Sequence, residues 1–489
     1  MKAFIATLIV ILFINLPAAP PRGKVPWAQR FAKPKTVTTD DASRLNRTEV
    51  MEVRAVPGNP DEAEKELQSI LARASMDRIK VSIAGARHTM GGHTIAPGGI
   101  VIDMRPFNQL ELRENGRILR TGSGALWSQI LPFLDQHGLS VGVMQSNNSF
   151  SVGGSLSANC HGWQYNRAPI ASTVESFRLM KVDGQIIRCS RDVNNELFSL
   201  ALGGYGLFGI ILDADLRTVP NKVYQIDRKV LPFGEAIPYY TAQLKNDQQI
   251  EMAYARLNIV PDKLFDDIII STFRPTKGTP PPLRPPSKVL IRRSIFRFSA
   301  KSQVGKKLRW NAERSLEPKL QPDIFSRNQL LNEGVEIFGN RSPFSTDILH
   351  EYFVPPEKAK AFIDATREIV LKNKANLLNV TVRSVNEDQD TLLRYTDRQL
   401  LAFVMLFHQG RSKQSDKKME VLTVELINKA LDLGGRYYLP YRLHATREQF
   451  IRAYPMSRQF FQKKEKYDPD GILQNQFYIK YGIEKVPSL

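Results

Sequence analysis

Three glycine-rich stretches, always in loops between predicted elements, constrain this chain more than any other feature. They are GARHTMGGH at 85–93, SVGGSLSANCHG at 151–162 and GYGLFG at 204–209. Glycine permits positive φ and a close approach of the backbone to a ligand, and successive N–H groups can bind an anion. The stretches therefore predict loops that hold a ligand against the backbone.

The first stretch follows the predicted strand 79–85 and carries His88 in its middle. A loop rich in N–H groups can hold a pyrophosphate without a lysine. A histidine within such a loop has a use if its imidazole touches or bonds a cofactor. The alternative is a turn histidine that bonds its own loop, and the motif alone leaves both open.

The second stretch combines small residues with the apolar side chains of Val152 and Leu156, and no charge occurs between Gln145 and Arg167. Small residues at this density cannot build a core, but they let a flat or extended ligand lie against the backbone. A flexible surface loop is the alternative. We expect one long loop over 142–162.

The third stretch matches the letters G-x-G-x-x-G of the dinucleotide fingerprint. That fingerprint needs a strand before it and a helix after it. Here the helix-like segment 194–202 comes first and the alternating strand 209–219 comes second. The sequence therefore excludes a Rossmann site. It also contains no nucleophile elbow, Walker A loop, H-E-x-x-H motif or paired-cysteine motif.

Apolar periodicity and turn residues predict the elements around these loops. Asn59 and Pro60 mark the start of an amphipathic helix. The predicted elements are a strand at 51–56, a helix at 60–75, strands at 79–85 and 100–104, a helix at 126–138 and a hairpin at 175–190 that turns at Asp183-Gly184.

Charge and cysteine content narrow the class of protein. The net charge is +19 and the pI is near 9.7, which favours an acidic partner: nucleic acid, anionic lipid or an anionic cofactor. No nucleic-acid module accompanies the charge, so we expect a small-molecule substrate and no nucleic acid. Two cysteines exclude a disulfide scaffold and a multi-cysteine metal site, and we expect no metal. The oligomeric state stays open.

The N-terminus carries an apolar run from Ala3 to Leu16, followed by prolines and a basic stretch at 22–35. The run is short for a membrane span and has the length of a secretory signal. More positive charge follows it than precedes it, which favours an uncleaved anchor with the body on the cytoplasmic side. We expect a signal peptide or anchor at 1–21, and thus a chain that is exported or membrane-anchored, on an undecided side.

Composition shifts after Pro220. A proline-rich loop at 274–288 leads into residues 288–314, which carry nine basic residues and one acidic residue. On a helix, Arg293, Arg297 and Lys301 share one face, and Ile291, Ile295 and Phe298 lie roughly opposite. Such a pattern fits an anionic membrane surface. The alternative is the solvated face of an ordinary helix packed on the protein.

In this order and spacing, the three stretches resemble the FAD-binding domain of the vanillyl-alcohol oxidase/p-cresol methylhydroxylase family. The resemblance covers about 45–220 and resumes in YYLPYR at 437–442 and YDPDGIL at 467–473. It implies an α+β fold: a PCMH-type FAD-binding domain of two subdomains, with an α+β cap over the substrate. The implied boundaries are 45–222 for the FAD domain, 223–440 for the cap and 441–489 for a return to the FAD domain.

The resemblance also implies the cofactor contacts. In many members the loop histidine is bonded to the flavin, and His88 stands at that place, with Thr89 for the usual serine and Arg87 for a frequent glycine. Bicovalent relatives use a cysteine before the second stretch; residues 144–149 contain none, so a single link is expected. The implied FAD-binding residues are Ala84, Gly85, Ala86, Arg87, His88, Thr89, Met90, Ser146, Ser151, Gly153, Gly154, Ala158, Asn159, His161, Gly209 and Ile210.

The activity implied is FAD-linked oxidation of a CH–OH group, or secondarily CH–NH, with oxygen or a membrane electron carrier as acceptor. EYFVP at 351–355 resembles a strand of sugar-oxidising members, which follow it with Glu-x-Arg; here Thr381 replaces the glutamate and Arg383 remains. Their later His-Trp-x-Lys is also missing. A C=C reductase of the sterol-reducing branch and a non-catalytic flavin-binding protein remain alternatives. The candidate catalytic residues are Arg383, Tyr438 and Tyr441, with Arg442 and His444 as weaker ones.

Overall fold

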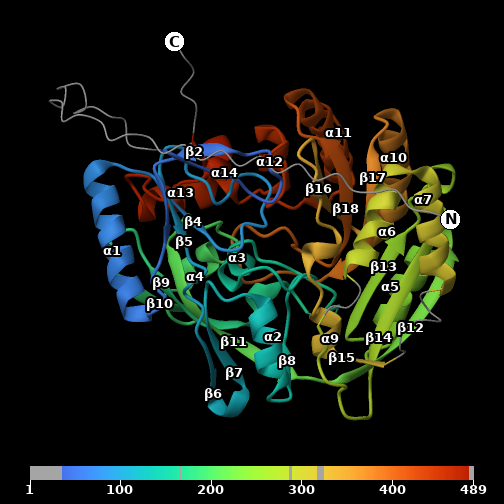
Figure 1. Cartoon of the computed structure of the whole chain (residues 1–489), viewed down its shortest axis with the longest axis horizontal. Coiled ribbons are helices and arrows are strands. Elements are labelled where there is room, and N and C mark those ends of the chain that lie inside the picture. The colour runs from blue at the N-terminus through green and yellow to red at the C-terminus, as the bar shows by residue number, and fades with distance from the viewer. Residues whose placement is uncertain (1–35, 166, 286–288, 317–323, 484–489) are drawn as a thin grey trace, which may run out of the picture. The chain divides into compact units, whose positions relative to one another are not determined.

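The chain is an α+β protein whose strands form one large sheet, two smaller sheets and a two-stranded ribbon (Figure 1). The computed structural model describes residues 36–165, 167–285, 289–316 and 324–483. The predicted signal or anchor at 1–21 lies outside these residues. Within them, no helix is both long enough and apolar enough to cross a membrane.

A parallel three-stranded sheet supports the first glycine-rich stretch. Helix α1 (Pro60–Asp77) starts at Asn59, whose side chain accepts hydrogen bonds from the N–H groups of Asp61 and Glu62. The helix packs its apolar stripe on the sheet, and β4 ends directly before Gly85. The strand order is β3 (Glu52–Ala55), β5 (Ile100–Asp103) and β4 (Val81–Ala84).

The second small sheet is antiparallel and has β11 near its centre. Its hairpin turns at Gly184, which has φ +81° as such a turn requires. The order is β10 (Ile186–Ser190), β9 (Val174–Met180), β11 (Ile210–Pro220), β7 (Ile118–Gly122) and β6 (Leu110–Arg113), and β8 (Leu139–Val141) also pairs with β11. Helices α2 (Trp127–Asp135), α3 (Val152–Ser157) and α4 (Asn195–Ala201) accompany it, and β1 (Val37–Thr39) and β2 (Thr48–Val50) form the ribbon.

An eight-stranded antiparallel sheet forms the centre of the later part of the chain. Its strand order does not follow the sequence, so residues far apart along the chain become neighbours. The order is β15 (Ile324–Ser326), β12 (Val223–Pro232), β14 (Asp267–Thr276), β13 (Met252–Leu257), β17 (Asn376–Val385), β18 (Leu400–Gly410), β16 (Ser345–Val354) and β19 (Arg436–Tyr437).

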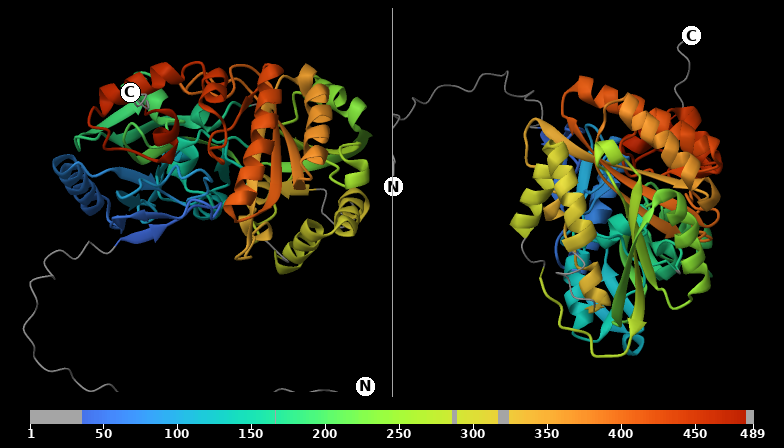
Figure 2. Two further views of the ribbon diagram at one scale, coloured as in Figure 1. Left: turned by 90° about the horizontal axis from the view of Figure 1, so that it is seen from above. Right: turned by 90° about the vertical axis from the view of Figure 1, so that its right-hand side faces the viewer.

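Helices cover this large sheet on both faces (Figure 2). Successive side chains of a strand point to opposite faces. Leu377 therefore packs in the core beneath α10 and α11, whereas Leu378 packs against α6 on the other face. One face carries α5 (Phe233–Asn246), α10 (Ala359–Lys372) and α11 (Lys413–Asp432), and the other carries α6 (Val289–Lys301) and α7 (Gln303–Asn311).

Two segments tie the large sheet to the smaller ones. In α9 (Arg327–Leu331), the buried guanidinium of Arg327 donates to the carbonyl oxygens of Val141 and Gly142 at 3.1 and 2.8 Å. After β19 the chain returns, and Leu473 pairs in parallel with Val81 of β4. This return contains α12 (Arg447–Ala453), α13 (Ser457–Tyr467) and α14 (Gln476–Tyr481).

Most predicted elements are confirmed, and the differences have local causes. The loop expected over 142–162 is interrupted by α3, because its small residues fit a short helix packed on β7 and β11. The helix expected at 126–138 ends at Asp135, three residues before Gly138 adopts φ +68°. Strand β14 extends to Thr276, so the proline-rich loop starts later than expected.

Candidate active site

The first two glycine-rich stretches are in direct contact. The N–H of Ala86 donates to Ser151 Oγ at 3.2 Å. A Cβ on Gly85 would lie 2.0 Å from that oxygen and 2.9 Å from Ser151 Cβ, closer than atoms can approach. Residue 85 must therefore be glycine, because Ser151 of the second stretch leaves no room for a side chain. The two stretches pack directly on each other.

Arg87 occupies a backbone position that favours glycine. Its φ is +56°, in the left-handed region. Its Nη1 donates to Thr39 Oγ1 at 3.1 Å, and its Nη2 lies 3.9 Å from Asp103 Oδ2. A residue other than glycine in this conformation costs roughly 1–3 kcal/mol, and these contacts hold the Arg87 side chain in place.

His88 of the first stretch packs against the two residues that precede the second stretch. The ring stacks on Phe150 at a centroid distance of 4.1 Å and an interplanar angle of 11°. Its Nε2 lies 3.1 Å from the carbonyl oxygen of Ser149. Burial lowers the pKa of His88. A carbonyl oxygen can only accept, so Nε2 carries the proton and Nδ1 of the neutral ring keeps its lone pair.

The second stretch is packed as tightly as the first. A Cβ on Gly162 would lie 2.0 Å from the carbonyl oxygen of Met144, and one on Gly153 would lie 2.8 Å from Ser123 Cβ. The stretch also supplies acceptors: the carbonyl of Ala158 accepts from Tyr438 Oη at 2.8 Å. Tyr438, expected near the substrate, is thereby anchored to the backbone of this stretch.

Asn159 uses both ends of its side chain within the protein. Its Nδ2 donates to Asp388 Oδ2 at 2.8 Å and its Oδ1 accepts from the N–H of Ala171 at 3.1 Å. Its φ of +48° is one that asparagine tolerates. The side chain thus fixes the turn of the second stretch.

Strand alternation brings two charged residues to one face of the large sheet. Glu351 of β16 pairs with Val404 of β18, and Arg383 of β17 pairs with Ala402, two residues away on the same strand. Both side chains therefore point away from α10 and α11. Arg383 Nη2 donates to Ser146 Oγ at 2.5 Å, which links the sheet to the loop before the second stretch.

A buried polar cluster forms where this face meets the second stretch. His161 Nε2 lies 2.6 Å from Glu351 Oε1, and Tyr441 Oη donates to Glu351 Oε2 at 3.1 Å. His161 and Glu351 are 5% and 3% exposed, so their contact is protected from solvent. Of the catalytic candidates, Arg383 and Tyr441 belong to this cluster, and Tyr438 packs against Tyr441 at 5.8 Å between ring centroids.

The electrostatics of the cluster keep Glu351 charged. Burial by itself would raise the pKa of Glu351, but His161, Arg383 and Tyr441 together lower it below its ordinary value. Burial also lowers the pKa of Arg383 and raises that of Tyr441. A carboxylate that accepts hydrogen bonds next to a cation is stabilised in its ionised form.

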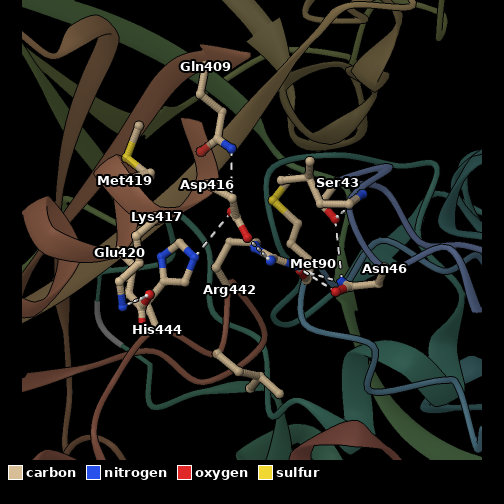
Figure 3. Close-up of polar contacts among 12 residues, drawn as sticks. Ser43, Asn46, Met90, Gln409, Asp416, Lys417, Met419, Glu420, Arg442 and His444 are labelled. Carbon is tan, nitrogen blue, oxygen red and sulfur yellow. Dashed lines mark hydrogen bonds and ion pairs between the residues drawn. The ribbon is translucent and has the colours of Figure 1, made fainter. Parts of the chain in front are cut away.

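Arg442 and His444 lie in a different cluster (Figure 3). Arg442 Nη2 donates to Asp416 Oδ2 at 2.6 Å, and its Nη1 donates to Asn46 Oδ1 at 2.7 Å and to the carbonyl of Met90 at 3.2 Å. His444 Nε2 lies 3.3 Å from Asp416 Oδ1. Arg442 thus connects Met90 of the first stretch to Asp416 of α11, and His444 contacts the same carboxylate. These contacts indicate a positioning role for both residues.

The third stretch joins α4 to β11, as expected, and this order confirms that it is not a dinucleotide fingerprint. Gly209 has φ +145°, and a Cβ there would lie 2.7 Å from the carbonyl oxygen of Met180. Ile210 pairs with Met180 in the sheet and is fully buried.

Known proteins are similar to this chain in sequence. Residues 61–190 match the family model described as FAD binding domain. The chain is 23% identical to L-gulonolactone oxidase of Mus musculus over 436 residues, 85% of this chain and 92% of that protein. It is 31% identical to cytokinin dehydrogenase 7 of Oryza sativa subsp. japonica over 153 residues, 30% of this chain and 29% of that protein. The chain is an FAD-linked oxidoreductase with an α+β fold of the PCMH type.

The residues of this oxidoreductase fit FAD. Three buried hydroxyls on the contacting loops make no hydrogen bond to any described residue: Thr89, Ser123 and Ser149. Buried polar groups normally find partners, so these three hydroxyls suit a ligand rich in acceptors. FAD supplies such acceptors in its phosphates and ring.

Sequence reasoning placed His161 only among the FAD contacts of this oxidoreductase and did not assign a role to Glu351. The two are distant in sequence, and only the packing of the sheet on the second stretch brings them together. The resemblance of residues 351–355 to a strand of sugar-oxidising members was a usable signal. Glu351 and Thr381 both pair with Val404, from opposite sides of β18.

Proposed function

We propose that this enzyme oxidises a CH–OH group of a small molecule and that the cluster around Glu351 takes the hydroxyl proton. When bound, the flavin of FAD accepts the hydride. The single observation that carries the proposal is the buried contact of 2.6 Å between His161 and Glu351, on the surface formed with the second glycine-rich stretch. CH–NH oxidation is the second option.

His161 is suited to accept the proton. Because Glu351 is ionised, its Oε1 accepts from His161, and Nε2 therefore carries the hydrogen. In the neutral form of the ring, Nδ1 is the nitrogen that can take a proton, and it is buried with no hydrogen-bond partner among the described residues. A substrate hydroxyl can supply that partner, and Glu351 stabilises the imidazolium that forms when the proton moves to Nδ1.

Arg383 stabilises negative charge in the same cluster. Ser146 accepts from Nη2, while Nε is buried and makes no hydrogen bond within the described part of the chain. A fixed cation in a buried site stabilises an oxygen that develops negative charge more strongly than it would in water. Tyr441 keeps Glu351 oriented through its hydrogen bond of 3.1 Å.

The flavin is proposed to be bonded to His88 through Nδ1. The hydrogen bond from Nε2 to Ser149 and the low pKa leave Nδ1 unprotonated, and the stack on Phe150 fixes the ring. A histidyl bond withdraws electron density from the flavin and strengthens it as an oxidant. Oxygen or a membrane electron carrier is the proposed acceptor, and residues 1–21 are proposed as a signal or anchor.

Relatives support the substrate class. The relative matched along most of its length is, by its name, an oxidase of L-gulonolactone, a molecule that bears CH–OH groups. The matches to cytokinin dehydrogenases 7 and 6 cover only 30% and 31% of this chain. The CH–OH option therefore has the wider support.

A denaturing gel of purified protein, soaked in acid and viewed under ultraviolet light, tests the bond to His88. We expect a fluorescent band from the wild type and from His137→Ala, whose histidine is exposed and distant in sequence. His88→Ala should give a dark band. A fluorescent His88→Ala band would contradict the assignment, and a dark wild-type band with yellow supernatant would retain FAD but remove the covalent bond.

A further inference from the structure

Helix α6 packs on the large sheet through an unexpected face. The residues that it buries are Phe296, Ser299 and Ala300, which pack near Leu378 and Leu406. Arg297, on the border of this face, forms an ion pair with Asp347 at 2.5 Å. The apolar stripe predicted from the sequence is therefore not the side that packs on the protein.

That stripe instead faces solvent, in the direction opposite to the packing face. Large apolar side chains at helical spacing are normally the buried ones. Here they continue from α6 onto α7, which packs beside it through the close approach of Gly305 to the carbonyl of Phe298. The exposed residues are Leu290 at 74%, Ile291 at 60%, Ile295 and Phe298 at 52%, Val304 at 63% and Leu308 at 58%.

Positive charge borders this apolar surface. Lys301 ends α6 beside the stripe, and Lys307 lies beside Val304 and Leu308 on α7. Other basic residues of the segment are paired: Arg292 with Glu333, Arg297 with Asp347 and Arg309 with Glu313. Lys301 and Lys307 form no ion pair with a described residue, so the surface combines exposed apolar side chains with cations that no described carboxylate neutralises.

A pocket of about 370 Å³ opens beneath the turn between α6 and α7. Three lysines are among its lining residues: Lys301 at the end of α6, Lys374 on the loop after α10, and Lys306, which is 9% exposed. Lys306 Nζ donates to Asn376 Oδ1 at 2.9 Å and retains two further donors. The lysines of this lining suit an anionic group such as a phosphate.

We propose that the α6–α7 surface docks on a membrane of anionic phospholipid, with the six apolar side chains among the acyl chains and the lysines at the phosphates. Amphipathic helices with basic flanks bind such interfaces in this way. A second copy of the chain is a poorer occupant, because a two-fold contact would bring the same basic residues against each other. The proposal does not depend on the proposed oxidation.

A fluorescent probe at the surface tests this in the full chain. An environment-sensitive label is attached to Phe298→Cys, and to Met76→Cys on α1 as the control; the native Cys160 and Cys189 are buried and should resist labelling. Met76 is 78% exposed and far from α6 in sequence. With vesicles of phosphatidylcholine and phosphatidylglycerol, we expect a blue shift at position 298 alone, reduced by salt and absent with phosphatidylcholine only.

Paired substitutions test the apolar contribution. The double variant Ile291→Glu/Ile295→Glu should weaken vesicle binding at least about tenfold, because charge replaces two apolar side chains that are proposed to lie among the acyl chains. Its flavin content should be unchanged. Met76→Glu should bind as the wild type does, and Lys306→Met should reduce the preference for the anionic lipid.

Three results would overturn the proposal. Vesicle binding without a shift at position 298 would mean that another segment binds the lipid. A shift that grows with protein concentration in the absence of lipid would mean that a second copy covers the surface. The absence of vesicle binding by the wild type would remove the membrane as occupant.

Discussion

The FAD-binding part and the large-sheet part of this enzyme build the site by different means. In the first, glycines allow backbones to touch: Gly85, Gly153 and Gly162 each leave no room for a Cβ. In the second, an ordinary antiparallel sheet presents a few charged side chains, Glu351 and Arg383, on one face. The first part is specified by backbone geometry and the second by side-chain chemistry.

This difference explains why a match to a family covers residues 61–190 and not the large sheet. Close backbone contacts tolerate almost no substitution, so they keep a readable motif. The proposed site draws on both parts, with His161 in the second glycine-rich stretch and Glu351 on the sheet.

Acid should destabilise both parts, and this is the largest effect that we expect. Burial lowers the pKa of His93 in the first part and of His350 in the second from 6.5 to about 3. A depressed pKa stabilises the fold above pH 6.5, and this stability is lost as the pH falls from 6.5 toward 3. Each histidine should lower the free energy of unfolding by about 3 kcal/mol between pH 6.5 and pH 4.

Urea unfolding at pH 7 and pH 4, followed by flavin fluorescence and by circular dichroism, measures this loss. His350→Gln should remove the contribution of His350 to the loss of unfolding free energy at low pH. That contribution is about half of the loss expected from the two histidines together. An equal free energy of unfolding at the two pH values would show that neither histidine is held neutral. Separate transitions for the two probes would show that the parts unfold independently.

A smaller effect separates the two parts directly. Gly162→Ala should cost about 1–3 kcal/mol and lower the flavin content, because its Cβ would lie 2.0 Å from the carbonyl oxygen of Met144. Gly234→Ala on α5 is the matched control, because a Cβ there meets nothing within 4 Å. We expect it to retain flavin and to be neutral or slightly stabilising, as measured by thermal unfolding and absorbance at 450 nm. Equal losses of stability and of flavin in the two variants would contradict the proposed difference between the two parts.

Local signals predicted much of the fold. Asn59 and Pro60 marked the start of α1, Asp183-Gly184 marked a hairpin, and the order of elements around Gly204–Gly209 correctly excluded a Rossmann site. These features depend on a few neighbouring residues. The family resemblance came from three such signals taken in order.

Features set by long-range packing were not predictable. Periodicity showed that α6 is amphipathic, but only the packing of Phe296 and Ala300 reveals that Ile291, Ile295 and Phe298 face solvent. The contact between His161 and Glu351 likewise depends on how the large sheet meets the second stretch.

The central claim is that His161 takes the substrate proton and that Glu351 stabilises the imidazolium that forms. Anaerobic stopped-flow reduction of the flavin by its alcohol donor tests it, with Glu351→Gln and the exposed Glu368→Gln at equal flavin content. Proton transfer to a positioned side chain typically contributes about 100- to 10,000-fold to the rate, and without the charge of Glu351 most of that contribution should be lost. We predict that loss for Glu351→Gln and a wild-type rate for Glu368→Gln. A Glu351→Gln enzyme that reduces its flavin at the wild-type rate would contradict the account.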